Sequence, residues 1–230
     1  MRLCFMPDTL ARGRWSGTLG DFSHMKLSAY IVRVDTGFSP NPFGRRCTLA
    51  CCKPTIRRNA EFGDIIVGTG SVHGGMSGRI VYAMRVGRII PFQTYWEQYP
   101  SKRPSQRTVV SKRGDNIWHQ EPFGVWRGVP AALHNDSHRE RDLRGENVLI
   151  ASEFFYFGRE AIPVPAKFAD ILATTQGHKN TYDTDLIDRF WRWLSRVAPK
   201  RGRIGLPSEF TDAACSLQST DAGDDEDACE

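Results

Sequence analysis

The sequence predicts an α+β fold in which a strand-rich central sheet is followed by helices towards the C-terminus. Two observations lead to this fold class. Apolar segments of strand length occupy residues 27–157, and an apolar stripe at helical spacing begins only after residue 183. We expect a mixed or antiparallel sheet, or a partly open barrel, of which a PUA-like arrangement is one form.

The first three segments have the patterns of strands. Residues 27–34 alternate between apolar and polar side chains, which is typical of a strand. A turn-rich loop follows at 37–44, and residues 64–69 form a short apolar run that predicts a buried strand. The glycines of 74–78 then turn the chain into 79–90, so that these two strands form a predicted hairpin.

The middle of the chain contains a long irregular insert. Residues 97–146 are polar, basic and rich in Trp, His and Gly, and they predict loops with a few short elements. Irregular segments of this length are often functional. Residues 147–157 follow as another strongly β-forming segment.

Helices are predicted near the C-terminus. Residues 168–172 indicate a short helix, and acidic residues at 183–185 begin a longer one that ends at Pro199. The apolar stripe of this second helix consists of Leu186, Phe190, Trp193, Leu194 and Val197.

Composition divides the chain into three parts. We interpret 1–24 as an irregular leader, with Met25 as the natural start, 25–210 as a single domain, and 211–230 as an acidic disordered tail. No apolar run is long enough for a membrane span, and 1–24 lacks the apolar core of a secretory signal. We therefore expect a cytoplasmic protein without membrane partners.

The charge distribution favours phosphate-bearing partners. The formal net charge is +5, but the tail from 211 carries seven acidic residues and no Lys or Arg, which leaves +12 on 1–210. A basic body attracts phosphates, and an acidic tail can compete for the same face. The alternative is that both only aid solubility.

The cysteines are expected to be reduced, because three of the six crowd into positions 47–52. Cys52 lies close in sequence to Lys53, Arg57 and Arg58, whose positive charge would stabilise a thiolate nucleophile. Cys47 is the second candidate. The alternative is that both thiols are small buried apolar groups.

Neither a metal site nor a standard phosphate loop is predicted. The C-x3-C-C spacing lacks paired zinc ligands, although His134 and His138, four residues apart, could complete a site with a cysteine. The Gly-rich run at 68–75 lacks the Gly-Lys-[Ser/Thr] of a Walker loop and is interpreted as a hairpin turn. No cofactor can be named.

Several residues are candidates for contact with a nucleotide or DNA. His178 lies beside Lys179 and could meet a phosphate or act as a general acid or base. Asp115, Asn116 and Trp118 could hydrogen-bond and stack a base, although an Asx turn explains Gly-Asp-Asn equally well. The full candidate set for binding is Lys53, Arg57, Asp64, Thr69, Ser71, Tyr82, Asp115, Asn116, Trp118 and Lys179, with Cys52 and His178 as candidate catalytic residues.

Taken in order, several unusual blocks make the chain resemble the nucleotide modification associated domain 2 family, Nmad2, of phages and prokaryotes. The blocks include 35–43, 47–58, 63–70, 82–86, 114–118, 153–158 and 177–179, and the resemblance covers roughly 27–207. We expect a single cysteine before Lys-Pro in this family, so the doublet Cys51-Cys52 is a departure that weakens the case for Cys51.

The resemblance implies a role in making or handling modified bases in DNA, with no reaction to transfer. Three hypotheses follow. The first is a nucleotide- or DNA-interacting domain, which we favour. The second is an enzyme of base hypermodification that uses Cys52 or His178, and the third is a non-catalytic accessory subunit that binds other DNA-modification proteins.

Overall fold

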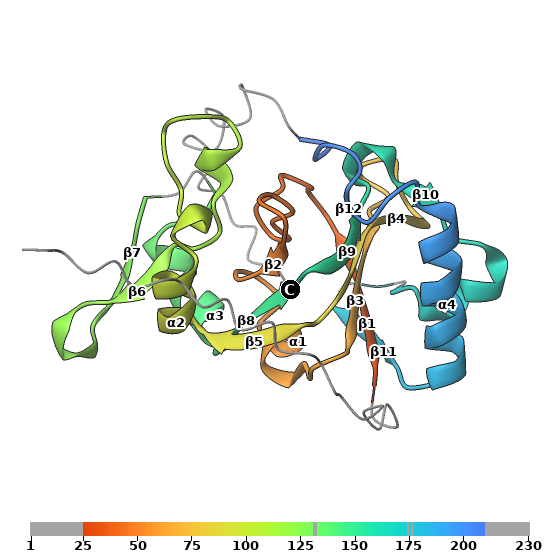
Figure 1. Ribbon diagram of the computed structural model, residues 1–230, viewed down its shortest axis with the longest axis horizontal. Coiled ribbons are helices and arrows are strands. Elements are labelled where there is room, and N and C mark those ends of the chain that lie inside the picture. Colours follow the sequence, from red (N-terminus) through yellow and green to blue (C-terminus); the bar gives the residue numbers. More distant parts are fainter. Residues whose placement is uncertain (1–24, 131–132, 174, 176, 210–230) are drawn as a thin grey trace, which may run out of the picture.

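The structure is a computed structural model that describes residues 25–209 except 131–132, 174 and 176. The predicted leader, 1–24, and the predicted acidic tail, 211–230, lie outside the described residues. Figure 1 shows a large sheet covered on one face by a long helix, with smaller sheets and short helices beyond its other face.

The large sheet is mixed and has seven strands. Strand β1 pairs in parallel with β3 and antiparallel with β11, while β4 pairs antiparallel with β3, β9 and β10. The order is β11-β1-β3-β4-β9-β12, with β10 also on β4. The strands are β1 (Leu27–Val32), β3 (Ile65–Gly70), β4 (Arg79–Arg85), β9 (Glu153–Tyr156), β10 (Ile162–Pro163), β11 (His178–Thr181) and β12 (Gly202–Arg203).

Two smaller sheets complete the β structure. The order β2-β8-β5 forms one, and β6 pairs with β7 in the other. Their strands are β2 (Cys47–Leu49), β5 (Arg88–Pro91), β6 (Trp118–Gln120), β7 (Trp126–Gly128) and β8 (Asn147–Ala151). The predicted α+β class is confirmed, and the described strands form no closed barrel.

Two segments that the sequence predicts as single strands are each divided between sheets. Residues 79–90 form β4 and β5, separated at Gly87, and 147–157 form β8 and β9, separated at Ser152. In the large sheet β4 pairs with β9, and in the next sheet β5 pairs with β8. The Gly87 N–H donates to the Ile150 carbonyl at 2.9 Å across the junction. The antiparallel pair therefore bends as a unit, which hydrophobic patterning does not reveal.

The predicted C-terminal helix is confirmed as α4 (Thr184–Val197). The Asp183 side chain caps it by accepting a hydrogen bond from the Leu186 N–H at 3.0 Å. The other α-helices are α1 (Pro54–Asn59), α2 (Phe92–Gln98) and α3 (Arg139–Leu143). Six 3₁₀ turns are described: η2 (Pro100–Lys102), η3 (Ser111–Arg113), η4 (Pro122–Gly124), η5 (Asp136–His138), η6 (Gly158–Glu160) and η7 (Ala166–Ile171). Turn η7 is the short helix predicted at 168–172. No helix in the described part of the chain has the length and apolar character needed to cross a bilayer.

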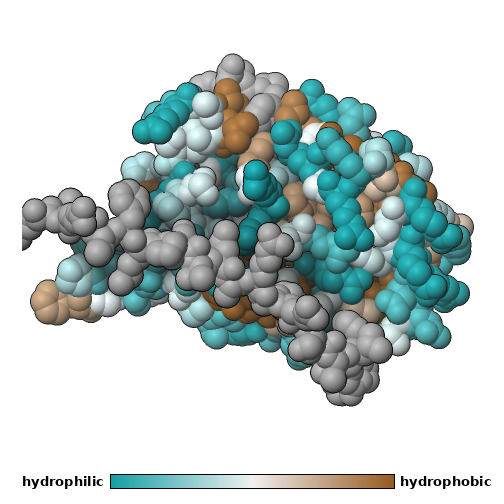
Figure 2. All heavy atoms as spheres, in the orientation of Figure 1, coloured by the Kyte–Doolittle hydropathy of each residue, from teal (hydrophilic) through white to brown (hydrophobic). Residues whose placement is uncertain are grey.

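Three apolar clusters separate these layers. One lies between α4 and the large sheet, where Phe190 and Leu194 meet Leu27 and Val67. A second fills the opposite face of that sheet, and the third lies beneath α2 and the β6–β7 hairpin. Both faces of the large sheet are buried, so the alternation in β1 separates two cores and does not separate core from solvent. Figure 2 shows hydrophilic residues over most of the visible surface, with apolar residues in separate patches.

We expect Phe190→Ala to lower the free energy of unfolding by about 3–5 kcal/mol, because it leaves a cavity between α4 and the sheet. Phe190 is fully buried in this cluster. Urea denaturation followed by circular dichroism measures the change. The neighbouring exposed Arg189 provides the control, and Arg189→Ala should change stability by less than about 0.5 kcal/mol. Equal effects from both variants would show that α4 does not anchor the core.

Candidate cysteine–histidine–aspartate site

The candidate nucleophile lies in a tight strand–turn–helix connection. Strand β2 ends at Leu49 and α1 begins at Pro54, and between them Cys52 (φ 58°) and Lys53 (φ 44°) both adopt left-handed backbone conformations. This region is uncommon for residues other than glycine, and strained turns of this kind are found at functional sites. A nucleophile on a sharp turn between strand and helix is held clear of the sheet.

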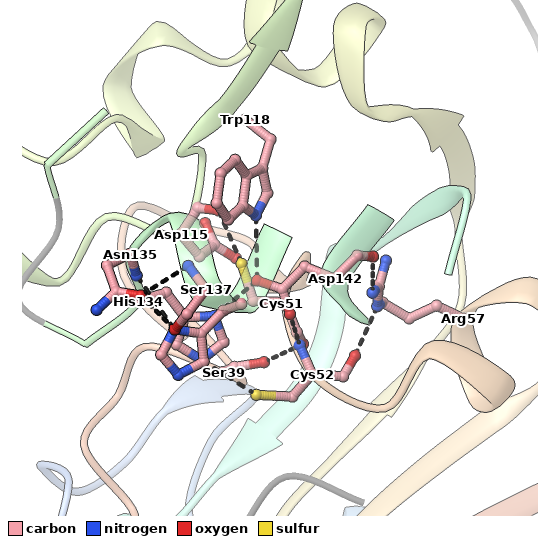
Figure 3. Close-up of polar contacts among 11 residues, drawn as sticks. Ser39, Cys51, Cys52, Arg57, Asp115, Trp118, His134, Asn135, Ser137 and Asp142 are labelled. Carbon is pink, nitrogen blue, oxygen red and sulfur yellow. Dashed lines mark hydrogen bonds and ion pairs between the residues drawn. The ribbon is translucent and has the colours of Figure 1, made fainter. Parts of the chain in front are cut away.

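The Cys52 thiol faces a histidine, which in turn faces a carboxylate. Cys52 Sγ lies 3.6 Å from His134 Nε2, and His134 Nδ1 lies 2.6 Å from Asp142 Oδ2 (Figure 3). All three residues are buried. With Nδ1 protonated, His134 donates to Asp142 and leaves Nε2 to accept the thiol proton. The geometry is that of a nucleophile, a general base and a group that orients the base.

The Asp142 carboxylate is held ionised by the donors around it. The Cys52 N–H donates to Oδ1 at 2.9 Å, and Trp118 Nε1–H donates to Oδ2 at 3.1 Å. Burial by itself raises the pKa of Asp142, but the hydrogen bond and charge of His134, the Cys52 N–H and the charge of Arg57 outweigh it and lower the pKa to about 2. Asp142 can therefore stabilise an imidazolium on His134.

Two rings pack against the His134 imidazole. The His138 ring stacks on it with centroids 4.4 Å apart and planes 15° apart, and the Phe38 ring lies at 4.8 Å. His138 is itself positioned by the Asn135 N–H, which donates to His138 Nδ1 at 3.2 Å. These ring contacts and the hydrogen bond to Asp142 favour the orientation in which Nε2 faces Cys52.

The two neighbouring cysteines differ from Cys52 in their surroundings. Cys47 and Cys51 are both fully buried. Burial raises the pKa of the Cys47 thiol to about 12 and raises that of Cys51 well above its ordinary value. For Cys51 the negative charges of Asp142 and Asp115 add to the effect of burial, so both thiols are held neutral. Among the described cysteines, Cys52 has the environment of a nucleophile.

The same cluster offers atoms that a metal ion could use. One ligand atom each from Cys51, His134 and Asp142 lie within 4.8 Å of one another. Sulfur, nitrogen and oxygen ligands of this kind suit zinc. A metal bound there would occupy a ring nitrogen and a carboxylate oxygen that the hydrogen bonds of Asp142 and His134 now use.

Arg57 connects the backbone segments that carry Cys52 and Asp142. It is fully buried, and its guanidinium donates to the carbonyls of Cys52 (2.7 Å), Asn147 (2.7 Å) and Asp142 (2.5 Å). A Cβ atom at Gly145 would lie 2.3 Å from Arg57 Cζ, so this glycine leaves the space that the guanidinium fills. Arg57 thus fastens the start of α1 to α3, which carries Asp142, and Figure 3 shows it on the side of Asp142 away from His134.

The structure brings some of the predicted residues together. Lys53, which follows Cys52 in the sequence, and His178 line one cavity of about 340 Å³. Trp118 joins the site as a donor to Asp142. Lys179 is exposed in β11, the edge strand that begins with His178.

Other predicted residues are buried and do not line this cavity. Asp64 is paired with Lys26 at 2.7 Å, and Tyr82 shares a hydrogen bond with Tyr30 at 2.8 Å. The hydroxyls of Thr69 and Ser71 donate to the carbonyls of Tyr30 and Arg33. Asp115 accepts from Thr48 and Tyr95, and Asn116 donates to the carbonyls of Tyr95 and Tyr99.

Sequence reasoning missed the partners of Cys52. It considered His134 only as a metal ligand with His138, and it did not select Asp142. Their sequence separations from Cys52 are 82 and 90 residues. The signal that the sequence does offer is their location in the long irregular insert, 97–146, because irregular segments of this length are often functional.

We expect the stabilising effect of Asp142 to decrease in acid. Its folded pKa, about 2, is below the ordinary value of 3.8, so its contribution is complete above about pH 4 and is lost as the pH falls towards 2. The difference in unfolding free energy between wild type and Asp142→Asn should therefore shrink by about 2 kcal/mol over this range. Urea unfolding at a series of pH values measures it.

The control is Asp136→Asn, which changes an exposed carboxylate of the same insert that is paired with Arg139 at the surface. We expect it to change the unfolding free energy by less than about 0.5 kcal/mol. A wild-type to Asp142→Asn difference that stays constant or grows in acid would contradict the ionised state of Asp142.

Comparison with known proteins identifies the family. The family model described as nucleotide modification associated domain 2 matches residues 24–214. No curated protein and no solved structure shows a significant match. The match covers most of the chain and includes every residue of the cysteine–histidine–aspartate site, so this protein belongs to the nucleotide modification associated domain 2 family.

Proposed function

We propose that this protein is a cysteine-dependent acyl-transfer enzyme that acts in the modification of nucleotides or of bases in DNA. The observation that carries the proposal is the alignment of Cys52, His134 and Asp142 through contacts of 3.6 Å and 2.6 Å. The family description supports the nucleotide context. Of the two catalytic residues predicted from sequence, the geometry supports Cys52.

In the first half of the reaction, the thiol forms a covalent intermediate. His134 Nε2 takes the Cys52 proton as Sγ attacks the carbonyl carbon of an amide or ester, and Asp142 stabilises the resulting imidazolium. The tetrahedral adduct collapses as His134 returns the proton to the leaving amine or alcohol. An acyl group then remains on Cys52 as a thioester.

In the second half, an acceptor removes the acyl group. Water or an amine attacks the thioester and gives its proton to His134, and Cys52 leaves as a thiol when it takes that proton back. With water the result is hydrolysis, and with an amine it is transfer of the acyl group. No electrons are exchanged with an outside oxidant, so the residues of the chain account for every step.

A second candidate function is a binding module for nucleotides or DNA, either alone or as the non-catalytic subunit of a modification complex. The cavity lined by Lys53, Arg58, Arg141 and Arg144 favours it, because cations bind phosphates without any need for a nucleophile. Both candidates fit a reducing compartment such as the cytosol, since Cys47, Cys51 and Cys52 form no disulfide.

The chromogenic ester p-nitrophenyl acetate tests for acyl transfer without knowledge of the natural substrate. We expect a burst of p-nitrophenolate and an acetyl group on Cys52 that hydroxylamine removes, because a thioester accumulates before the slower water step. Cys52→Ala should abolish the burst, and His134→Gln should slow it by about 100-fold. Stopped-flow absorbance and peptide mass spectrometry measure the two readouts.

Cys51→Ser is the matched control, since it alters the adjacent buried thiol and keeps Cys52. It should retain the burst. The proposal fails if acetylation occurs on Cys51, or if wild type and His134→Gln react at the same rate. Addition of zinc separates the metal-binding alternative, because an ion held by Cys51, His134 and Asp142 would suppress the burst in wild type.

A further inference from the structure

A cationic cavity is lined by residues of α1 and α3, the two helices next to Cys52 and around Asp142. Its volume is about 340 Å³, at the lower end of the roughly 300–1,000 Å³ typical of small-molecule sites. Its walls come from α1, from α3 with the residue after it, and from the start of β11. The lining residues are Lys53, Pro54, Thr55, Ile56, Arg58, Arg141, Arg144, Gly177 and His178.

The charge of this cavity is one-sided. Four lining residues are Lys or Arg, a fifth is His178, and the described lining includes no Asp or Glu. The pKa of His178 is lowered, first by burial and then by the positive charge of Lys53, which is consistent with a positive potential inside the cavity. A site of this kind attracts an anion and concentrates it near the walls.

Donors are available for that anion. Arg58 and Arg144 are exposed, and no ion pair or side-chain hydrogen bond is found for either guanidinium within the described chain. Arg141 Nε is buried and has no hydrogen-bond partner among the described residues. Guanidinium groups bind phosphate oxygens through pairs of N–H donors, which makes phosphate the anion that this geometry suits best.

Two residues of the cavity lining are sequence neighbours of catalytic residues. Lys53 follows Cys52 in the chain, and Arg141 precedes Asp142. Arg57 bonds the carbonyls of both Cys52 and Asp142, so the wall formed by α1 and the wall formed by α3 are fixed to each other. An anion held between Arg58 and Arg141 therefore has a fixed relation to the thiol.

We propose that this cavity binds the phosphate group of the substrate and thereby positions the substrate's acyl group at Cys52. The inference deepens the proposed function, since it names phosphate-bearing compounds as the substrate class. The phosphate belongs either to a free nucleotide or to the backbone of a nucleic acid. Both share the same charge chemistry, and the experiment below distinguishes them.

Binding is measured by isothermal titration calorimetry on the Cys52→Ala protein, which removes chemistry from the readout. The probes are inorganic phosphate, thymidine 5′-monophosphate, thymidine, and a short oligothymidylate without terminal phosphate. We expect the monophosphate to bind and thymidine not to bind. Binding of the oligothymidylate but not of the monophosphate would assign the cavity to the nucleic acid backbone.

Arg58→Ala and Arg144→Ala remove exposed cations from the cavity, so neither is expected to disturb folding. Each should weaken binding of the phosphate-bearing probe by about tenfold, because one charge-assisted contact is lost. Arg139→Ala is the matched control in α3. Arg139 does not line the cavity and is paired with Asp136, and its removal should leave affinity unchanged within about twofold.

A second readout connects the cavity to the thiol. In the wild-type protein, the phosphate-bearing probe should slow alkylation of Cys52 by iodoacetamide, and Arg58→Ala should remove most of this protection. Equal binding of thymidine and its monophosphate overturns the inference. It is also overturned if Arg58→Ala and Arg144→Ala both leave the affinity for the phosphate-bearing probe unchanged. Absence of binding by all phosphate-bearing probes also overturns it.

The two proposals fail in different ways. An acetyl-Cys52 burst with no phosphate binding would retain the acyl-transfer function and reject the phosphate site. Phosphate binding with an inert Cys52 would retain the cavity as a binding site and reject the chemistry, and with it the assignment of the phosphate compound as substrate.

Discussion

The candidate site depends on the buried carboxylate of Asp142. It accepts hydrogen bonds from the Cys52 backbone, the Trp118 indole and His134, and these residues come from three segments of the chain. An unpaired carboxylate in this position would be costly to bury, so the three segments must converge for the fold to be stable. The hydrogen bonds that satisfy the Asp142 carboxylate also place His134 between this carboxylate and the Cys52 thiol.

The elements that are decided locally could be predicted from the sequence. Helix α4 follows its apolar stripe from a capping Asp183, and β1 and β3 follow short apolar patterns. The division of 79–90 and 147–157 between two sheets could not be predicted, because apolar residues are favoured on either side of the bend at Gly87. That bend is set by the pairing of two strands distant in sequence.

The candidate site was predictable only in part, because sequence proximity is a poor guide to the environment of a side chain. The cations near Cys52 in the sequence predict a stabilised thiolate, yet Arg57 is fully buried and its guanidinium donates to backbone carbonyls. The group that contacts the thiol is His134, 82 residues further along the chain. Similarly, Asp115 and Asn116 have the polarity of ligand-binding residues but satisfy buried groups of the fold.

A left-handed turn at Cys52 and Lys53 is unfavourable by itself, so the surrounding structure must compensate for it. The Cys52 N–H is bound by Asp142 and its carbonyl by Arg57, which fixes the backbone on both sides of the thiol. The same turn places Lys53 in the lining of the cationic cavity, with its Nζ 4.9 Å from the centre of the Tyr30 ring, while its neighbour Cys52 meets His134. One strained dipeptide thereby carries both the candidate nucleophile and a lysine of the cavity lining, so a substrate held in the cavity would lie at a fixed spacing from the thiol.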